Sequence, residues 1–321
     1  MSKIYVNARC KALENKLLST KKLNQMIDSK SPIQALKILT DNKIGYTITT
    51  DPYQFEIILE EEKQKFFEFI KSLPLDDEIK DYFLIPQDYY NAEIIVKSEI
   101  TGDKTILDLL KTSGKIEIKK LIDCIQNNDL SLLPKHLSKL LERKDLKILS
   151  GKNLSTTFKK SLYEDILSIS NNKLLQEIIN TKIDLINIES CFRVDSKEDF
   201  KTIAKINGGK LNDEVFDIIC DRDTSKISKI KHCYLYEDIK PLLENKETKS
   251  LSKIEKKIDD IPLIKLNNNE YKYKIEGVYP TLKYLFLVQS MIKNIRIVMV
   301  GLINNLSSEE IRDRLRWNYE G

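Results

Sequence analysis

The segment from Tyr284 to Ile303 constrains the fold of this chain most, because it approaches the length and apolar character of a membrane span. Gln289, Lys293, Asn294 and Arg296 nevertheless lie near its middle. A charged side chain at the centre of a bilayer costs roughly 2.5–3.5 kcal/mol. We therefore expect a buried helix of a soluble protein, in which these polar groups find partners.

The composition favours helices over strands. Glycine and proline number 9 and 8 among 321 residues, which is about 5 % against a usual ~12 %. A strand-rich fold needs these two residue types at its many turns, and this chain has few of them. Apolar residues recur at the helical period in residues 6–17, in residues 33–39 after the Ser31-Pro32 cap, and in residues 251–261. We predict an all-α chain. The β-branched residues of the runs IRIVMVGLI and NAEIIV favour strands by propensity. Both runs are too short and too apolar for periodicity to decide between helix and strand.

One polar pattern occurs three times. It reads DYYNAEIIVK at Asp88–Lys97, DLINIESCFR at Asp184–Arg193 and MIKNIRIVMV at Met291–Val300. Its asparagines, Asn91, Asn187 and Asn294, are 96 and 107 residues apart. This spacing predicts three helical units of about a hundred residues, with boundaries at 1–104, 105–208 and 209–321.

The pattern has a physical interpretation if each copy is helical. An aspartate three residues before the asparagine shares its helix face, and Pro86 suggests that the first copy begins a helix, where an acid is favoured by the helix dipole. An asparagine among apolar residues must find hydrogen-bond partners, because an unpaired buried amide costs about 1–3 kcal/mol. We favour a structural role in packing, and direct contact with a partner stays open as the alternative.

Several function classes are disfavoured. The net charge is only +4, from 53 basic and 49 acidic side chains that are mixed along the chain. Nucleic-acid binding usually requires a strongly basic surface, so this function is disfavoured. The five cysteines, Cys10, Cys124, Cys191, Cys220 and Cys233, are widely spaced and accompany two histidines. We therefore expect reduced cytosolic thiols, with neither a zinc site nor a disulfide framework. The first residues lack the apolar core of a signal peptide.

An enzyme is also disfavoured. Asp88 with Tyr89 and Tyr90, or the acidic run at residues 60–62, offers acid–base groups without a nucleophile, metal cluster or phosphate-binding loop. The acidic run is interpreted as a solvated helix face. We expect no catalytic residue, no metal and no cofactor, and no binding of ATP by this chain.

Four segments together resemble a known family. They are YVNARCKALENKLLS, PLDDEIKDYFLIPQDYYNAEIIVK, INGGKL and YLFLVQSMIKNIRIVMVGLINNLSSEEIRDRL, and they extend in order from residue 5 to about residue 315. At this spacing they resemble the family of C subunits of the bacterial and archaeal V-type (A-type) rotary ATPases and ATP synthases, whose counterpart in the eukaryotic V-ATPase is the d subunit.

The resemblance implies an all-helical, funnel-like protein of three similar helical-bundle domains in a pseudo-threefold arrangement. It implies a non-catalytic central-stalk protein that connects the soluble rotor shaft to the membrane rotor ring and transmits torque, for ATP-driven H⁺ or Na⁺ transport or for ATP synthesis. Such a protein is a monomer within the complex, cytoplasmic and peripheral at the membrane, without insertion into it. The alternative is a generic all-helical scaffold or adaptor with no ATPase role.

Ten residues are candidates for structural or interface roles: Arg9, Glu14, Asp88, Asn91, Lys97, Asp184, Asn187, Arg193, Asn294 and Arg296. Members of the resembled family tend to carry an acid where this chain has Met291, and Arg where it has Lys11. The missing acid raises the question of what Arg296 binds. Our hypothesis is Glu14, on the first helix.

Overall fold

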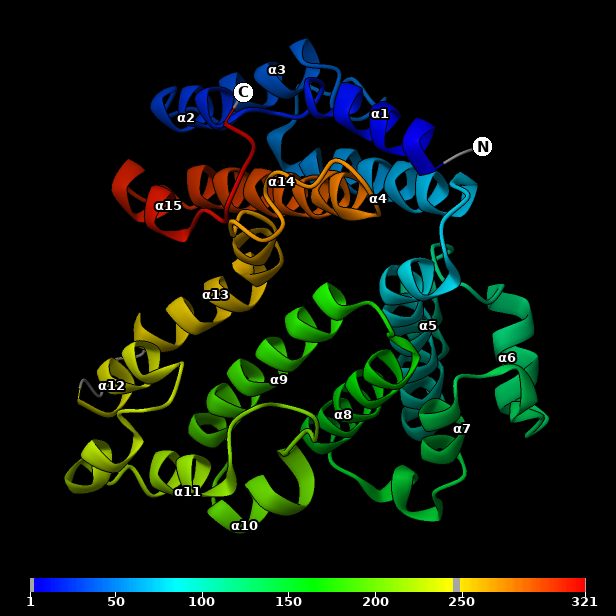
Figure 1. Ribbon diagram of the computed structural model, residues 1–321. Helices are drawn as coiled ribbons and strands as arrows, with labels where there is room; N and C mark the ends of the chain where they lie inside the picture. The colour runs from blue at the N-terminus through cyan, green and yellow to red at the C-terminus, as the bar shows by residue number, and fades with distance from the viewer. Residues whose placement is uncertain (1–2, 245–248, 321) are drawn as a thin grey trace. The chain divides into compact units, whose positions relative to one another are not determined.

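A computed structural model describes residues 3–244 and 249–320, and these residues form helices without a β-strand (Figure 1). The prediction of an all-α chain is therefore confirmed. Both β-branched runs are helical, one within α5 (Asp77–Thr101) and the other within α14 (Tyr279–Ile303). Burial of these helices outweighs the weak strand preference of their isoleucines and valines.

The chain divides into two compact units, which are described separately. The terminal unit consists of Met1–Leu75 and Asp259–Gly321, and the middle unit is Asp76–Ile258. The boundary on the C-terminal side falls inside α13 (Lys249–Leu266). The division into three units at 1–104, 105–208 and 209–321 stays a prediction.

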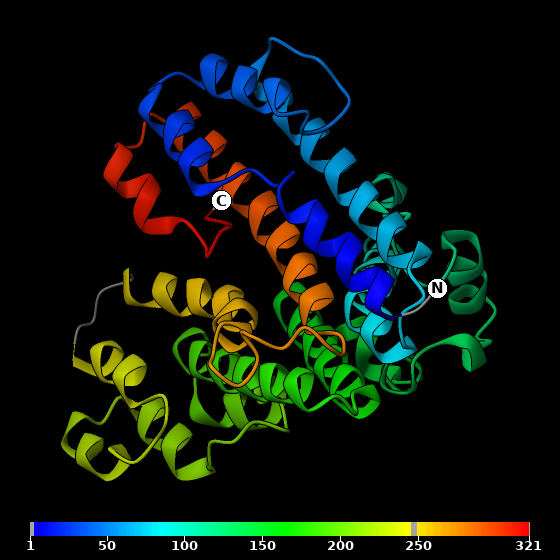
Figure 2. The ribbon, with the colours of Figure 1, turned by 45° about the horizontal axis from the view of Figure 1, so that its top comes forward.

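The terminal unit is organised around α14. Its other helices are α1 (Lys3–Glu14), α2 (Thr20–Asp28), α3 (Pro32–Asp41), α4 (Phe55–Ser72) and α15 (Ser308–Arg314). Figure 2 shows α14 in orange alongside α1 and α4, and it also contacts α2, α3 and α15. In the part of the chain that the structure describes, α14 is the one helix long and apolar enough to cross a bilayer, and 67 % of its most apolar window is buried. Helix α14 is thus the central, largely buried helix of this unit.

Local signals set where these helices begin. The Ser31 hydroxyl accepts a hydrogen bond from the backbone of Gln34 at the start of α3, as the Ser31-Pro32 pair predicts. Ser307 and Glu310 form a capping box at α15.

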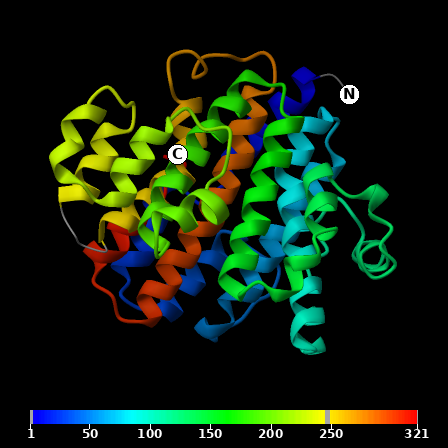
Figure 3. The same cartoon turned by 90° about the horizontal axis from the view of Figure 1, so that it is seen from below.

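Within the described residues, the middle unit contains α5 and seven further whole helices. They are α6 (Ile118–Gln126), α7 (Lys135–Leu141), α8 (Gly151–Ile169), α9 (Lys173–Arg193), α10 (Lys197–Asp199), α11 (Asp213–Asp221) and α12 (Tyr236–Glu244). Helix α8 packs against both α5 and α9. Figure 3 shows α5 in cyan next to the green helices of this unit. A π-helical turn, Phe200–Ala204, continues α10.

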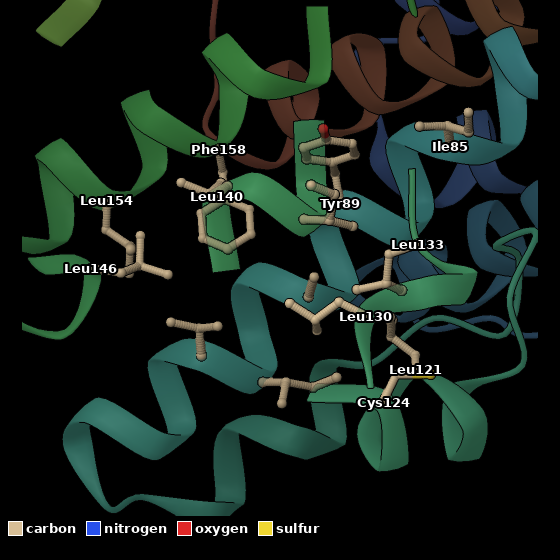
Figure 4. Close-up of a cluster of buried hydrophobic side chains, with 14 residues drawn as sticks. Ile85, Tyr89, Leu121, Cys124, Leu130, Leu133, Leu140, Leu146, Leu154 and Phe158 are labelled. Atoms are coloured by element: carbon tan, nitrogen blue, oxygen red, sulfur yellow. The ribbon is translucent and has the colours of Figure 1, made fainter. Parts of the chain in front are cut away.

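A buried apolar cluster joins α5, α6, α7 and α8 (Figure 4). The rings of Tyr89 on α5 and Phe158 on α8 meet edge to face, with centroids 6.5 Å apart. The expectation that Pro86 marks a helix start is wrong, because α5 begins at Asp77 and contains Pro86. Proline removes one helical hydrogen bond, and the packing of α5 on its neighbours outweighs that loss.

Candidate functional site

The first two repeated asparagines each hold one distant backbone residue through two hydrogen bonds. Asn91 Nδ2 donates to the carbonyl of Lys111 at 2.8 Å, and the Lys111 N–H donates to Asn91 Oδ1 at 2.9 Å. Asn187 makes the same pair of bonds with Ile206, at 2.8 and 2.9 Å. Both asparagines are at most 1 % exposed. We call this arrangement an amide clamp, and it ties a loop to the helix that carries the asparagine.

The third copy forms an amide clamp with the C-terminal segment. Asn294 Nδ2 donates to the carbonyl of Arg316 at 3.1 Å, and the Arg316 N–H donates to Asn294 Oδ1 at 2.7 Å. The next residue, Trp317, donates its N–H to Asp260 Oδ1 at 2.7 Å. The expectation that each buried asparagine finds partners is thus confirmed.

Asp88 binds the same loop that Asn91 holds, a few residues further along the chain. Its two carboxylate oxygens accept the backbone N–H groups of Lys115 and Ile116, at 3.1 and 3.0 Å. A β-carbon on Gly114 would lie 2.2 Å from Asp88 Oδ1. The close approach of loop and carboxylate therefore requires glycine at this position.

Asp184 repeats this arrangement on α9. Its oxygens accept the N–H groups of Lys210 and Leu211 at 2.7 and 3.1 Å, and Tyr234 donates its hydroxyl to Oδ2 at 2.6 Å. A β-carbon on Gly209 would lie 2.0 Å from Oδ1. Burial raises the pKa of the Asp184 carboxyl, although these hydrogen bonds oppose the rise.

Neither aspartate lies in the first turn of its helix. Asp88 is well inside α5 and Asp184 is well inside α9. The expectation of a helix-dipole role is therefore wrong. These carboxylates are stabilised by backbone N–H groups from loops instead.

The third copy lacks the aspartate and uses other groups. Met291 Sδ accepts a hydrogen bond from the backbone N–H of Leu18 at 3.3 Å. Asp260 on α13 accepts the backbone N–H that follows the Asn294 clamp, as described above. A carboxylate near the third clamp thus comes from a different helix, which the spacing of the pattern did not indicate.

Arg296 binds Glu56 on α4, and our hypothesis that it binds Glu14 is wrong. Its Nε and Nη2 donate to the two oxygens of Glu56 at 2.7 and 2.5 Å. Residues two apart on a helix point to opposite sides, so Arg296 faces α4 while Asn294 faces the C-terminal segment. Glu14 is only 2 % exposed and pairs with Lys11 at 2.5 Å.

Lys97 and Arg193 each form an ion pair within their own helix, and Arg193 also binds Glu255 on α13. Lys97 contacts Glu93 at 2.5 Å one helical turn earlier, and it also donates to the Ser155 hydroxyl at 3.2 Å. Arg193 contacts Glu189 at 2.6 Å in the same spacing. Such pairs contribute about 0.2–0.5 kcal/mol each to a helix. An interface role for these two residues stays a prediction.

The terminal unit contains a cleft of about 310 Å³ that several basic side chains line. We call it the basic cleft, and its lining combines four cations, one acid and apolar or aromatic side chains: Arg9, Lys16, Lys43, Lys65, Glu62, Leu13, Leu17, Ile44, Phe66, Phe69, Tyr284, Val288 and Met291. The Arg9 guanidinium lies 5.1 Å from the centre of the Phe69 ring. Among the described residues, neither Lys16 nor Lys43 has a carboxylate partner. The basic cleft suits an acidic group attached to an apolar one.

The acidic run on α4 is more than a solvated face. Glu61 Oε2 accepts the backbone N–H groups of Tyr46 and Thr47 at 2.5 and 3.0 Å, and Glu62 accepts that of Gly45 at 2.7 Å. These bonds hold the loop that carries Lys43 beside the basic cleft. The hydrogen bonds lower the pKa of the Glu61 carboxyl against the opposing effect of desolvation.

Sequence reasoning missed Asp165. This residue is 1 % exposed and accepts the Tyr89 hydroxyl at 2.6 Å and the N–H groups of His136 and Leu137 at 3.0 and 3.2 Å. Tyr89 therefore serves a buried structural network, in which its hydroxyl binds Asp165. A single acidic residue in a helix gives no sequence pattern that predicts a structural role. The role of Asp165 is evident only from its burial in the structure. Residues 3–244 and 249–320 contain no group of three or more potential metal ligands.

Comparisons with known proteins agree with one another. Residues 6–314 match the family model described as "ATP synthase (C/AC39) subunit". The chain is also 24 % identical, over 338 aligned positions, to the C subunit of the V-type sodium ATPase of Enterococcus hirae, and the alignment covers 98 % of both chains.

Proposed function

The chain belongs to the ATP synthase (C/AC39) subunit family, and from this premise we propose that it is a non-catalytic central-stalk component of a V-type rotary ATPase. In this role it connects the soluble rotor shaft to the membrane rotor ring and transmits torque between them. The family match over residues 6–314 is the observation that carries the proposal. The protein works as a monomer within the complex, at the cytoplasmic face of the membrane.

The internal construction of each unit supports this role. Torque passes without loss only through a body whose loops and helices do not slip past one another. Amide clamps of Asn91 and Asn187 tie loops to α5 and α9 in the middle unit, and the clamp of Asn294 ties the C-terminal segment to α14 in the terminal unit. The asparagine of each clamp is buried, and leaving a buried amide without its hydrogen bonds is costly.

The partners that we propose are the shaft proteins and the rotor ring. Contact with the short polar loops of a ring needs polar side chains and no membrane-inserting patch. The basic cleft is our candidate for one contact with an acidic partner surface. The transported ion is H⁺ or Na⁺, and the ring determines which; the relative from Enterococcus hirae is part of a sodium ATPase by its name.

Affinity purification from native membranes tests the proposal. The tagged full-length chain, expressed in its own host, should recover the shaft and ring proteins of a V-type ATPase, identified by mass spectrometry. An untagged strain is the control. Recovery of unrelated partners without ATPase components would favour a generic helical scaffold. The isolated chain should also show no binding of ATP, since it has no phosphate-binding loop.

A further inference from the structure

Two thiols of the middle unit lie close enough to react with each other. Cys191, near the end of α9, and Cys220, near the end of α11, have their Sγ atoms 2.6 Å apart. An S–S bond measures about 2.05 Å. We propose that Cys191 and Cys220 are a redox-modification site, at which a peroxide converts the two thiols into a reversible disulfide. The wide spacing of the cysteines along the chain, which predicts reduced thiols, gives no sign of this pair.

Helices α9 and α11, whose places in the fold Figure 1 labels, pack against each other, and side-chain contacts around the pair hold them together. Lys197, which follows α9, binds both Asp217 and Asp221 on α11, at 3.2 and 3.0 Å. The guanidinium of Arg222 lies 5.7 Å from the centre of the Phe192 ring. These contacts lie close in sequence to both cysteines and hold their helices together. A bond between the two sulfurs therefore needs only a small movement of the cysteine side chains.

The two thiols differ in a way that assigns their roles. Cys191 is 3 % exposed, and burial raises the pKa of its thiol, whereas Cys220 is partly exposed. The hydrogen bond between the two thiols lowers the pKa of the Cys220 thiol. The thiolate is the nucleophilic form. Cys220 is therefore the residue that attacks an oxidant first, and Cys191 is the resolving thiol.

The reaction proceeds in two balanced steps. The Cys220 thiolate attacks one oxygen of hydrogen peroxide, which breaks the O–O bond and leaves Cys220 sulfenic acid and hydroxide; the hydroxide takes up a proton to become water. The Cys191 sulfur then attacks the sulfenic sulfur, and the departing hydroxide takes the Cys191 thiol proton as a second water. Two thiols and one peroxide thus give one disulfide and two waters.

Peptide mapping of the full-length chain tests the site. The reduced protein is exposed to hydrogen peroxide, denatured, alkylated and digested with trypsin. We expect a linked pair of peptides, residues 183–193 with residues 211–222, and loss of two of the five alkylatable thiols. Dithiothreitol should restore all five. Five alkylated thiols after oxidation, or a link that joins other cysteines, would overturn the proposal.

Single-residue variants distinguish a disulfide between Cys191 and Cys220 from non-specific oxidation of the thiols. Cys220→Ser should abolish the link, and Cys191→Ala should leave Cys220 as a sulfenic acid that a dimedone probe labels. Cys233→Ser is the matched control, because Cys233 is a partly exposed thiol of the same unit with a neighbouring backbone N–H and no second thiol in hydrogen-bond reach among the described residues. It should form the link at the wild-type rate. An unchanged link in Cys220→Ser would contradict the site.

The disulfide should also change the stability of the middle unit. It closes a loop of the unfolded chain between α9 and α11, which restricts the unfolded state. Oxidised protein should therefore unfold at a higher urea concentration than reduced protein, and Cys220→Ser should show no such shift. Equal midpoints in the wild type would mean that oxidation does not connect the two helices.

Discussion

At the residue scale, asparagine suits the clamp because a short side chain must both donate and accept. Each of the three amides pairs with the N–H and the carbonyl of one backbone residue that lies 20, 19 or 22 positions further along the chain. Aspartate has no donor when ionised, and a longer side chain would lose more rotamer entropy on burial. The amide is therefore a specific requirement of the fold at these positions.

Replacing Asn187 by alanine should destabilise the protein. The change leaves the N–H and carbonyl of Ile206, which is 2 % exposed, without their partners. Two unsatisfied buried groups should lower the free energy of unfolding by about 2–5 kcal/mol, measured by urea titration. Asn171→Ala, at an exposed position of the same unit, is the control and should change it by less than about 0.5 kcal/mol. A wild-type midpoint for Asn187→Ala would refute the clamp.

The pair of Glu56 and Arg296 should give a pH-dependent contribution to stability. The hydrogen bond from Arg296 lowers the pKa of the Glu56 carboxyl below its usual value of 4.5. Stability from this pair is therefore present above pH 4.5 and is lost as the pH falls through the lowered value. At neutral pH, Glu56→Gln should lower the free energy of unfolding by about 0.2–1 kcal/mol, since both side chains are partly exposed.

The difference between Glu56→Gln and wild type should shrink as the pH is lowered below 4.5, measured by urea unfolding at several pH values. Arg296→Met serves as the control background, in which Glu56→Gln should have no effect. A difference that is the same at acidic and neutral pH would argue against the ion pair.

At the element scale, α14 shows how an apolar helix uses a few polar residues. Lys293 binds Asp259 on α13, Asn294 holds the C-terminal segment, and Arg296 binds Glu56 on α4. These side chains leave the helix in different directions, so each one fixes a different neighbour. The polar groups near the middle of the segment thus specify how α14 is packed in the terminal unit.

Loops that approach a helix closely should not tolerate a β-carbon. Gly209→Ala would place a carbon 2.0 Å from Asp184 Oδ1 and displace the loop that Asp184 holds. We expect a loss of about 1–3 kcal/mol in the free energy of unfolding by urea titration. Gly151→Ala is the matched control in the same unit. A β-carbon there meets nothing within 4 Å, and alanine at the first position of α8 should be neutral or slightly stabilising. Equal stability of the two variants would show that the loop moves freely.

At the scale of the whole molecule, the chain consists of two compact helical units, and α13 passes from one to the other. Proposed coupling between a shaft and a ring needs interfaces that are specific and yet allow assembly. Polar and charged contacts meet both needs, because they fix orientation and weaken when salt screens them. The basic cleft provides such charges on the terminal unit.

Binding to the shaft proteins should therefore weaken as ionic strength rises. Calorimetric titration of the purified chain with the shaft proteins, at low and at high salt, should show a several-fold increase in Kd. The double variant Lys16→Ala and Lys43→Ala should bind less tightly and show a smaller salt effect. Lys37→Ala, an exposed lysine outside the lining of the basic cleft, is the control. An affinity indifferent to salt would count against a polar contact.

The sequence by itself determined the helical class, the burial of the three asparagines and the family. Helical periodicity and capping residues act over a few positions, so they can be read locally, and a polar residue in an apolar run must be satisfied wherever it lies. The family follows from four segments whose order and spacing are visible in the chain alone.

Only the tertiary structure decided which groups meet. Arg296 and Glu56 are 240 positions apart, and neither carries a local signal for the other. The mid-helix place of Asp184, the carboxylate of Asp260 beside the third clamp, and the contact of Cys191 with Cys220 likewise depend on the paths of loops and the directions of helices. Those paths are set by packing between distant segments, which no short pattern along the chain specifies.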